Sequence, residues 1–328
     1  MNKQLSVAPM MDWTDRHCRY FHRLLSPHAL LYTEMVTTGA LLYGDKQRFL
    51  EFDNAEQPVA LQLGGSDSSA MAQCAEFAQK AGYQEVNINV GCPSDRVQNG
   101  PIGACLMSEP ALVAACVSEM KNKVDIPVTV KTRIGIDDFD SPEFLLQFVE
   151  TVSKAGCNTF IIHARKAILK GLSPKENRSV PPLNYERAYL VKREFPHLSV
   201  VVNGGVNTVE DIQQHWAKLD GVMIGREAYH NPFFLVDIEH QLCAQPMKDR
   251  VDVLHQFIPY VERQLNRGVG LQSITRHILG LFAGQPGGKI WRRYLSENAR
   301  SKNAGPDVLL AALNKMLPYQ PNLLASNN

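Results

Sequence analysis

The sequence predicts an α/β protein, a (β/α)₈ TIM barrel followed by a smaller C-terminal helical domain. Eight short β-rich runs recur within the first 225 residues, and most of them are apolar almost throughout. Parallel strands that are covered on both faces have this composition. Helix-like stretches separate the runs, as the alternation in such a barrel requires. A doubly wound open sheet is the alternative, but it normally has fewer strands, and no glycine-rich dinucleotide motif follows the first run. The expected strands span residues 5–8, 30–33, 59–63, 85–90, 127–131, 159–163, 199–204 and 221–225.

Four stretches between the strands carry helix start and stop signals. They have cap-type residues, proline or acids at their beginning, and two of them reach a glycine near their end. In the second stretch, Ser108 is expected to be the N-cap and Pro110 to lie in the first turn. The four stretches are residues 66–83, 108–124, 141–157 and 208–219.

The strand signal stops near residue 240, and amphipathic helical patterns follow. We therefore expect a catalytic barrel domain over residues 1–238 and a helical domain over residues 239–328. The last ten residues, 319–328, read as a loose tail. The expected helices of this domain are residues 249–268, 273–284, 288–301 and 306–317.

The composition is that of a globular protein, with 45% hydrophobic and 20% charged residues in 328. No apolar stretch is long enough to span a membrane, and the N-terminus has no signal-peptide core. The seven cysteines are scattered, with no CxxC pair and no zinc-like spacing to histidine. These features predict a reduced, cytoplasmic protein without a structural metal, and a monomer is the default expectation.

The charge is distributed unevenly along the chain. Residues 240–328 hold eleven Lys and Arg against five Asp and Glu, a net charge of +6, so the remainder carries −5 of the total of +1. A basic helical domain beside an acidic barrel favours a polyanionic partner. An ordinary solvated helical surface is the alternative interpretation of the charge by itself.

Polar and special residues gather where the predicted strands end, which is where barrels of this kind hold their active sites. Each has an ordinary structural explanation when it is taken alone, such as a core histidine, a rim lysine or a simple turn. Their joint appearance at successive strand ends favours a functional site. These residues are Pro9, Met10, Met11, Gln62, Asn87, Asn89, Cys92, Lys131, Thr132, Arg133, His163, Arg165, Asn203, Gly204, Gly205, Gly225 and Arg226.

The ends of the seventh and eighth strands predict a phosphate site. Barrels often bind phosphate between these two loops. Gly204, Gly205 and Gly225 let backbone N–H groups approach an anion, and Arg226 offers a planar fork of donors.

A flavin mononucleotide fits a phosphate site with this set of neighbours. Lys131 could stabilise negative charge on the N1/O2 side of the reduced ring. His163 and Gln62 could donate hydrogen bonds to the ring edge, and the backbone of Pro9, Met10 and Met11 could lie beneath it. Pyridoxal phosphate fits less well, because no Schiff-base lysine with a pyridine partner can be assigned.

Cys92 stands between a glycine and a proline at the end of the fourth strand. Gly91 can adopt backbone angles closed to other residues, and Pro93 disfavours helix at Cys92. The thiol is therefore expected on a stiff turn. A small buried residue at a tight corner is the alternative for a lone cysteine.

Eight segments together match the pattern of one known family. They are "APMMDWTDRHCR" (8–19), "YTEMVTTGAL" (32–41), "ALQLGGSD" (60–67), "EVNINVGCPSDRVQNGPIGACLM" (85–107), "VTVKTRIGID" (128–137), "IIHARKAILKGLSPKENR" (161–178), "VVNGGV" (201–206) and "DGVMIGREAYHNP" (220–232). In these segments the chain resembles the flavin-dependent tRNA-dihydrouridine synthases, and most of all the dihydrouridine synthase A subfamily. The resemblance covers roughly residues 5–300.

The resemblance implies an FMN enzyme that uses NADPH to reduce the C5–C6 bond of D-loop uridines in tRNA, at positions 20 and 20a for this subfamily. The family's catalytic cysteine corresponds to Cys92. Flavin N5 would supply hydride to C6, and the thiol, protonated at neutral pH in an ordinary cysteine, would supply a proton to C5. The family's FMN contacts correspond to Pro9, Met10, Met11, Gln62, Lys131, His163, Asn203, Gly204, Gly205, Gly225 and Arg226.

A tRNA substrate would account for the basic helical segment, since Lys and Arg neutralise phosphates. The target base would have to leave its stack to reach the barrel mouth. The expected tRNA contacts are Asn89 and Arg165 at the uracil edge, Lys175 and Arg178 in the loop after the sixth strand, and Arg292 and Arg293 in the helical domain.

Three alternatives stay open at this point. The first is a dihydrouridine synthase with a different uridine specificity. The second is an FMN oxidoreductase that acts on a free pyrimidine, which leaves the basic helical segment unexplained. The third is an RNA-binding protein that keeps the flavin only as a structural element.

Overall fold

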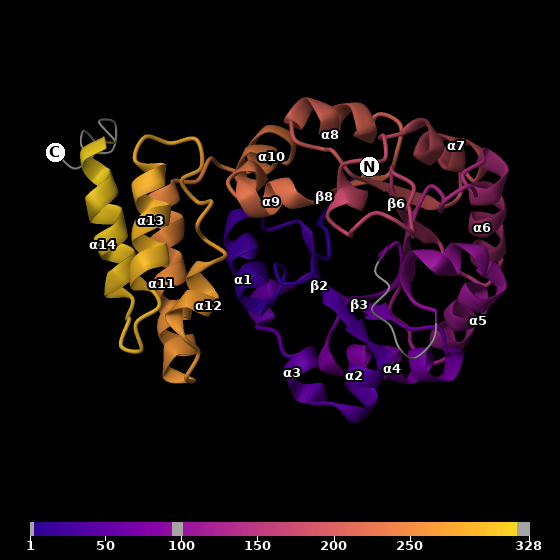
Figure 1. The fold of residues 1–328 in the computed structure, drawn as a ribbon, viewed down its shortest axis with the longest axis horizontal. Coiled ribbons are helices and arrows are strands. Elements are labelled where there is room, and N and C mark those ends of the chain that lie inside the picture. Colours follow the sequence, from indigo (N-terminus) through magenta and orange to yellow (C-terminus); the bar gives the residue numbers. More distant parts are fainter. Residues whose placement is uncertain (1–2, 94–100, 320–328) are drawn as a thin grey trace. The chain divides into compact units, whose positions relative to one another are not determined.

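The computed structural model describes residues 3–93 and 101–319. Its eight strands are all parallel and form a closed barrel in sequence order (Figure 1). This confirms the predicted fold class. Each expected strand is present within two residues at either end, except that β2 runs four residues further, past a register irregularity between Tyr32 and Met35. The strands are β1 (Gln4–Val7), β2 (Leu30–Thr37), β3 (Val59–Gly64), β4 (Glu85–Val90), β5 (Val128–Arg133), β6 (Thr159–His163), β7 (Ser199–Asn203) and β8 (Gly221–Ile224).

The contacts divide the chain into two compact units. Unit 1 comprises Met1–Thr14 and Ala29–Gly225, and unit 2 comprises Asp15–His28 and Arg226–Asn328. The sequence analysis divided the chain at residue 238, because strand-like runs stop near there. It could not assign residues 15–28 to the second unit, because that assignment depends on packing between segments far apart in the chain.

Unit 1 contains the barrel, and helices α4 to α8 lie around its outside (Figure 1). Its helices are α2 (Thr38–Tyr43), α3 (Lys46–Leu50), α4 (Ser68–Ala81), α5 (Pro110–Lys121), α6 (Pro142–Lys154), α7 (Glu186–Glu194) and α8 (Val209–Trp216), with 3₁₀ turns η1 (Asn54–Glu56), η2 (Gly103–Ser108) and η3 (Glu176–Arg178).

Local signals set most of these helix ends. Asp67, Ser141 and Thr208 cap α4, α6 and α8 by accepting backbone N–H bonds. The expected N-cap at Ser108 is wrong. Ser108 ends η2 and donates its hydroxyl to the Cys105 carbonyl at 2.8 Å, and the N-cap of α5 is Glu109. The 3₁₀ turn immediately before the helix uses the residue that would otherwise cap it.

Unit 2 is helical. Its helices are α1 (Arg16–Leu25), α9 (Arg226–His230), α10 (Phe234–Leu242), α11 (Arg250–Asn266), α12 (Leu271–Thr275), α13 (Gly288–Asn298) and α14 (Asp307–Met316), followed by η4 (Leu317–Tyr319). The helix expected over 273–284 is much shorter as α12. A Cβ at Gly280 would lie 2.5 Å from the His230 carbonyl oxygen, so the chain passes closely beside another backbone there. Most of the expected loose tail, residues 320–328, lies outside the described residues.

Asp15 shows why α1 belongs to unit 2. One carboxylate oxygen caps α1 through the backbone N–H groups of His17 and Cys18, and the other lies 3.0 Å from His277 Nε2. Burial by itself raises the pKa of Asp15, but the hydrogen bond and charge of His277 outweigh it and hold the pKa at about 2. The start of α1 is therefore joined to a residue 262 positions away in sequence.

A buried carboxyl group lies among the strands of the barrel. Glu85 on β4 accepts hydrogen bonds from the Tyr32 hydroxyl at 2.5 Å and the Thr129 hydroxyl at 2.6 Å. Burial raises the pKa of Glu85, and these two hydrogen bonds offset that rise only in part. The carboxyl group thus takes up its proton more readily in the folded protein than in the unfolded chain.

Glu85→Gln is expected to stabilise the protein relative to wild type increasingly as the pH rises. A carboxyl group with a raised pKa in the folded state makes the protein less stable as the pH rises from the pKa of the unfolded chain to that of the folded protein. Glutamine does not ionise, so the variant has no such loss. Each unit of pKa corresponds to about 1.4 kcal/mol. Urea unfolding of both proteins between about pH 5 and pH 8 measures the difference. Glu119→Gln, on an exposed part of α5, controls for the loss of a surface carboxylate. A difference in unfolding free energy that does not change with pH would contradict the prediction.

Candidate active site

Strand register brings several of the predicted site residues into adjacent positions at one end of the barrel. Asn89 on β4 is paired with Lys131 on β5. Arg133, two residues further along β5, is paired with His163 on β6, and His163 is paired with Asn203 on β7. Four neighbouring strands therefore present an amide, two cationic groups, an imidazole and a second amide at the same end.

Cys92 lies in a turn, residues 91–93, whose backbone is held on both sides. The Asn89 side-chain oxygen accepts hydrogen bonds from the backbone N–H of Gly91 at 3.1 Å and of Cys92 at 2.9 Å. The Cys92 carbonyl accepts from the backbone N–H of Ala104 at 2.8 Å. Gly103 has a φ of +82°, and a Cβ there would lie 2.3 Å from the Cys92 oxygen. Only glycine permits this approach, and the partly exposed Cys92 side chain is thereby given a defined position.

Asn89 and Gln62 are hydrogen-bonded to one another. Asn89 Nδ2 donates to Gln62 Oε1 at 2.8 Å, and Gln62 Nε2 donates to Asn87 Oδ1 at 2.8 Å. Asn87 Nδ2 in turn donates to the Thr129 hydroxyl that bonds Glu85. A continuous chain of polar side chains therefore runs from the buried carboxyl to the turn that carries Cys92. Each side-chain amide nitrogen uses one of its two N–H groups in this chain.

Lys131 supplies positive charge beside Cys92. Burial and, to a smaller extent, the charge of Arg133 lower its pKa to about 8, against the opposing effect of the Cys92 sulfur. The ammonium group is thus mainly charged at neutral pH, although it loses its proton more readily than an ordinary lysine.

Arg133 is a buried residue of this site to which the sequence analysis assigned no role. It is 2% exposed, and its guanidinium donates to three backbone carbonyls, those of Gly91 at 2.8 Å and of Lys166 and Asn177 at 3.0 Å each. Its position two residues after Lys131 puts both side chains on one face of β5, and this period of two could have indicated a shared site.

In the turn after β7, the backbone of two glycines lies very close to neighbouring side chains. Gly204 and Gly205 have φ of +109° and +73°. A Cβ on Gly204 would lie 2.5 Å from Cδ2 of His163, and one on Gly205 would lie 2.4 Å from Cδ1 of Leu183. The Tyr185 hydroxyl donates to the Gly204 carbonyl at 2.8 Å and holds the turn. No side chain larger than hydrogen fits at either position without displacing a neighbour.

The other predicted phosphate residues lie at the ends of β7 and β8. Asn203 is buried and donates its side-chain N–H to the Met223 carbonyl at 2.8 Å, so it joins these two strands. A Cβ on Gly225 would meet only Asn203 Nδ2, at 3.8 Å, which leaves open space at that backbone position. Arg226 follows directly as the first residue of α9 and is exposed.

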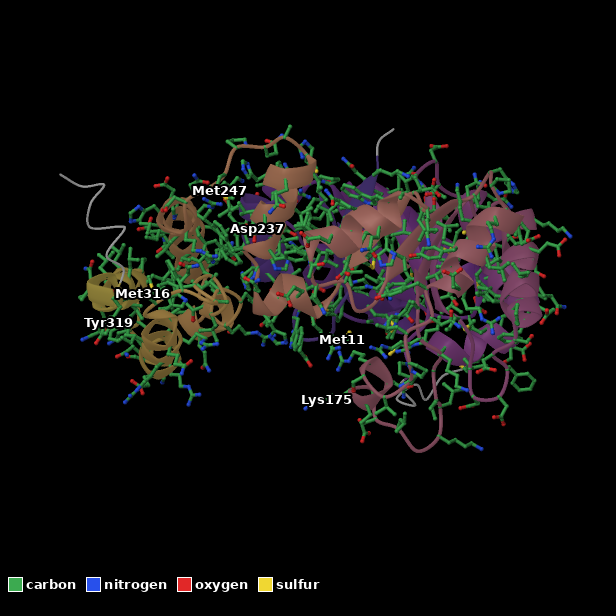
Figure 2. The ribbon with its side chains drawn as sticks, turned by 90° about the horizontal axis from the view of Figure 1, so that it is seen from above. Met11, Lys175, Asp237, Met247, Met316 and Tyr319 are labelled. Atoms are coloured by element: carbon green, nitrogen blue, oxygen red, sulfur yellow. The ribbon has the colours of Figure 1, made fainter. Side chains whose placement is uncertain are left out.

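The segment after β1 forms a compact turn. The N–H of Met10 donates to the Thr14 hydroxyl at 2.9 Å, and the carbonyl of Met10 accepts from the same hydroxyl at 3.2 Å. Met10 is buried, Pro9 is partly buried, and Met11 is 55% exposed (Figure 2).

The loop between β6 and α7, residues 164–185, carries three of the predicted tRNA contacts. We call it the β6 loop. Figure 2 shows Lys175 on the part of this loop that projects outward from the barrel, and its side chain is exposed. Arg178 in η3 is partly buried. Arg165 donates to the carbonyls of Pro181 and Ser179 within the loop, so its guanidinium shapes the loop.

The two predicted tRNA contacts of unit 2 differ from one another. Arg292 and Arg293 are both exposed on α13. Arg293 Nε lies 2.9 Å from Glu297 Oε1 one turn later, in an ion pair. Trp291 beside them is fully buried and donates its indole N–H to the Ile278 carbonyl at 3.1 Å.

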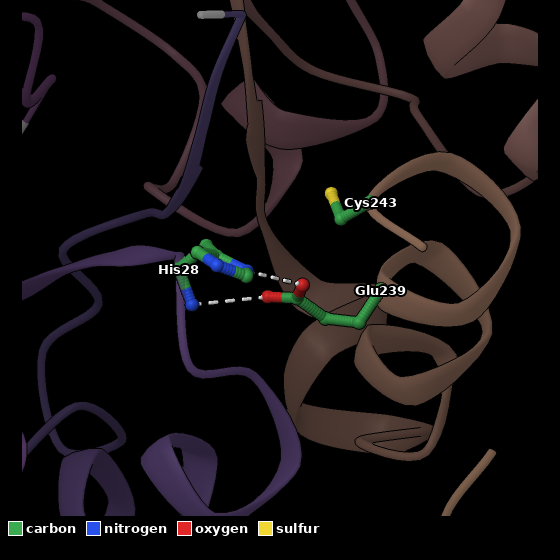
Figure 3. A group of neighbouring side chains, drawn as sticks. All are labelled: His28, Glu239 and Cys243. Atoms are coloured by element: carbon green, nitrogen blue, oxygen red, sulfur yellow. Dashed lines mark hydrogen bonds and ion pairs between the residues drawn. The ribbon is translucent and has the colours of Figure 1, made fainter. Parts of the chain in front are cut away.

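One group of metal-ligand residues comes together in the described part of the chain, His28, Glu239 and Cys243 in unit 2 (Figure 3). Glu239 is 1% exposed, and its oxygens accept from His28 Nδ1 at 2.8 Å, from the His28 backbone N–H at 3.1 Å and from the Ser26 hydroxyl. Burial, together with the Glu239 carboxylate, raises the pKa of the Cys243 thiol to about 11. The Glu239 carboxylate already accepts hydrogen bonds from donors of the protein. The three residues are therefore explained by a structural contact without a metal ion.

None of the described helices is both long and apolar enough to cross a membrane. The seven cysteines all lie within the described ranges, and all are free.

Comparison with known proteins gives a family match over most of the chain. The model of the family described as dihydrouridine synthase (Dus) matches residues 6–317. A curated relative from Vibrio cholerae, named tRNA-dihydrouridine(20/20a) synthase, is 60% identical over 320 residues, which are 97% of each chain. Relatives of the same name are 60% identical in Pasteurella multocida, over 94% of this chain and 95% of the relative, and 58% identical in Escherichia coli K12, over 94% and 90%.

Proposed function

Because the chain belongs to the dihydrouridine synthase family, we propose that it reduces the C5–C6 double bond of uridines in the D-loop of tRNA to 5,6-dihydrouridine. Positions 20 and 20a are the proposed targets, since they stand in the names of the relatives. NADPH is the proposed reductant. The observation that carries the proposal is the tightly held turn that presents Cys92 beside Lys131 at the carboxyl end of the barrel.

The residues present fit FMN as the cofactor. Gly204 and Gly205 hold positive φ angles that turn the chain sharply after β7, and Gly225 leaves open space after β8, so backbone N–H groups of these turns are proposed to approach a phosphate. Arg226, next in the chain, is proposed to add a bidentate contact to the phosphate. Lys131 would face negative charge on the ring, His163 and Gln62 would contact its polar edge, and the Pro9–Met11 backbone would lie against it. When bound, FMN would carry the two electrons of NADPH to C6 of the uracil as a hydride equivalent.

Cys92 is proposed as the general acid. Its Sγ–H would donate a proton to C5 as negative charge develops there, and solvent would return a proton to the sulfur afterwards. The hydrogen bonds to Asn89 Oδ1 and from Ala104 N–H use only backbone atoms of Gly91 and Cys92, so they fix the backbone that carries the thiol and leave the sulfur itself uncommitted. Lys131 places a positive charge beside Cys92, which favours the developing anion.

Substrate binding is proposed to use both units. In unit 1, Lys175 and Arg178 of the β6 loop are available for phosphates, and Asn89 and Arg165 for the uracil edge. Arg165 already donates to loop carbonyls, and Asn89 donates one N–H to Gln62, so any contact to the base uses their remaining N–H groups. In unit 2, Arg292 and Arg293 on α13 are the proposed phosphate contacts.

Mass mapping of tRNA tests the proposed function. The purified protein, loaded with FMN, is incubated with NADPH and unmodified tRNA, and dihydrouridine is located by mass spectrometry of nuclease fragments. A gain of 2 Da at positions 20 and 20a is expected, because reduction adds two hydrogen atoms. Free uridine and unfolded tRNA should stay unchanged. Reduction of free uridine at a comparable rate would favour a small-molecule oxidoreductase, and no reduction of any uridine would refute the proposal.

Replacing Arg292 and Arg293 by alanine is expected to weaken tRNA binding. It should also flatten the dependence of log affinity on log salt by about one to two units, since each lost phosphate contact removes roughly 0.7–0.9. Arg292 should contribute more, because Arg293 has Glu297 as an internal partner. Filter binding at several salt concentrations measures both quantities. Lys80→Ala with Lys154→Ala, which removes two exposed lysines from α4 and α6, is the matched control. An unchanged salt slope in the double arginine variant would place the phosphate contacts elsewhere.

A further inference from the structure

We propose that Arg133 is a positioning residue that holds the Cys92 turn and the β6 loop at a fixed separation. The structural part of this inference stands on contacts within unit 1. Its consequence for catalysis rests on the proposed function.

The guanidinium of Arg133 contacts two segments that are far apart in the chain. Nε donates to the carbonyl of Gly91, the residue before Cys92, at 2.8 Å. Nη1 donates to the carbonyls of Lys166 and Asn177 in the β6 loop, each at 3.0 Å. An arginine fork can serve both segments at once because its N–H donors diverge from one rigid plane.

Each of the two segments is ordered by its own hydrogen bonds. The Cys92 turn is held by Asn89 and Ala104, as described above. In the β6 loop, the fully buried Asn177 accepts from the Ile168 N–H at 2.8 Å through Oδ1 and donates to the Ile168 carbonyl at 2.8 Å through Nδ2. Arg133 therefore joins two pieces of chain that are each locally well defined, and it sets their relative position.

Within the described residues, the guanidinium of Arg133 is hydrogen-bonded to these three backbone carbonyls and to no carboxylate. Burial, with smaller contributions from the charges of Arg165 and Arg178, lowers the pKa of Arg133 to about 10, and the Cys92 sulfur opposes this shift. The group still carries its charge at neutral pH. A buried cation bonded only to neutral carbonyls costs free energy, and we infer that in Arg133 this cost is offset by the position that the three contacts give to the two segments.

The connection that Arg133 makes between the Cys92 turn and the β6 loop would affect the proposed reaction. One segment carries the proton donor, and the other carries Arg165, Lys175 and Arg178, the proposed contacts to tRNA. A displacement of about 1 Å between substrate and catalytic group can lower a rate 10²-fold. Arg133 would thus affect catalysis through geometry, without touching the uracil.

Two variants separate geometry from charge. Arg133→Lys keeps the positive charge beside Cys92 and Lys131 but lacks the fork, and Arg133→Met removes both. Arg187→Met is the matched control, because Arg187 donates to the carbonyl of Asp140 at 2.8 Å, in the loop before α6, and not to the Cys92 turn. All three are compared with wild type by hydrogen–deuterium exchange of the full chain, without tRNA.

Peptides covering residues 85–93 and 164–180 give the readout. In both Arg133 variants we expect amides in both peptides to exchange about 10–100-fold faster, because a charge-assisted hydrogen bond that limits local opening is lost. A peptide covering residues 199–206 should be unchanged, and Arg187→Met should leave residues 85–93 at the wild-type rate. Wild-type exchange in either peptide of the lysine variant would overturn the inference. The lysine variant carries the test if the methionine variant does not fold.

The kinetic arm tests the consequence. With FMN bound, reduction by NADPH should run at the wild-type rate in Arg133→Lys, while single-turnover oxidation by tRNA should fall about 10–100-fold. Equal loss in both half-reactions would contradict a positioning role. Failure of the proposed function has a different signature, since wild type itself would then form no dihydrouridine while the exchange result would still stand.

Discussion

Replacing Cys92 by alanine is expected to slow oxidation of the reduced enzyme by tRNA about 10²–10⁴-fold, the usual cost of removing a general acid. The substitution should leave the turn intact, because the bonds to Asn89 and Ala104 involve the backbone of residue 92 and not its sulfur. FMN content and reduction by NADPH should therefore match wild type. Stopped-flow absorbance of the flavin, with NADPH and with tRNA in separate single turnovers, measures the two half-reactions.

Cys105→Ala is the matched control for this experiment. Cys105 has a similar partial exposure and lies in η2, with its thiol donating only to the Ile102 carbonyl at 3.4 Å. Its removal should change neither half-reaction. If the Cys92 variant were oxidised by tRNA at the wild-type rate, the proton would come from another group, and the acid assignment would be wrong.

Gly204→Ala is expected to weaken FMN binding at least about tenfold and to lower the melting temperature. The residue has a φ of +109°, a conformation that costs an L-residue about 1–3 kcal/mol. The added Cβ would also lie 2.5 Å from the His163 ring, so the imidazole or the turn must move. Both changes act on residues proposed to contact the cofactor. Fluorescence titration of the apoprotein with FMN and thermal unfolding without FMN measure the two effects.

Gly82→Ala is the control that separates the effect of backbone strain from the effect of a collision with a neighbouring side chain. Gly82 also has a positive φ, +95°, but a Cβ there would meet only Phe52 at an ordinary 3.7 Å. It lies at the end of α4, before β4, and so away from the carboxyl ends of the strands. This variant should lose stability and keep wild-type FMN affinity. Equal FMN affinity in both variants would mean that the turn after β7 does not contact the cofactor.

The barrel could be predicted because its signals are local. Parallel strands covered on both faces must be apolar over their whole length, and this makes them readable in a single sequence. Caps such as Ser141 and Thr208 act on N–H groups two or three residues away, so they too could be predicted. The N-cap at Ser108 was mistaken because Ser108 is already the last residue of the 3₁₀ turn η2 and its hydroxyl bonds the Cys105 carbonyl within that turn.

The candidate site could be predicted in its residue types but not in its partners. The sequence alone determined the fold class, the set of chemically capable residues at the strand ends, and the placing of Cys92 between glycine and proline. Only the tertiary structure decided that Arg133 bonds Gly91 and Asn177, that Gln62 and Asn89 share a hydrogen bond, and that residues 15–28 belong with the C-terminal helices. The physical reason is distance along the chain. Backbone preference and burial periodicity act over a few residues, whereas a buried side chain takes its partners from whatever packing brings near it. Asn177 lies 44 positions from Arg133, and His277 lies 262 positions from Asp15.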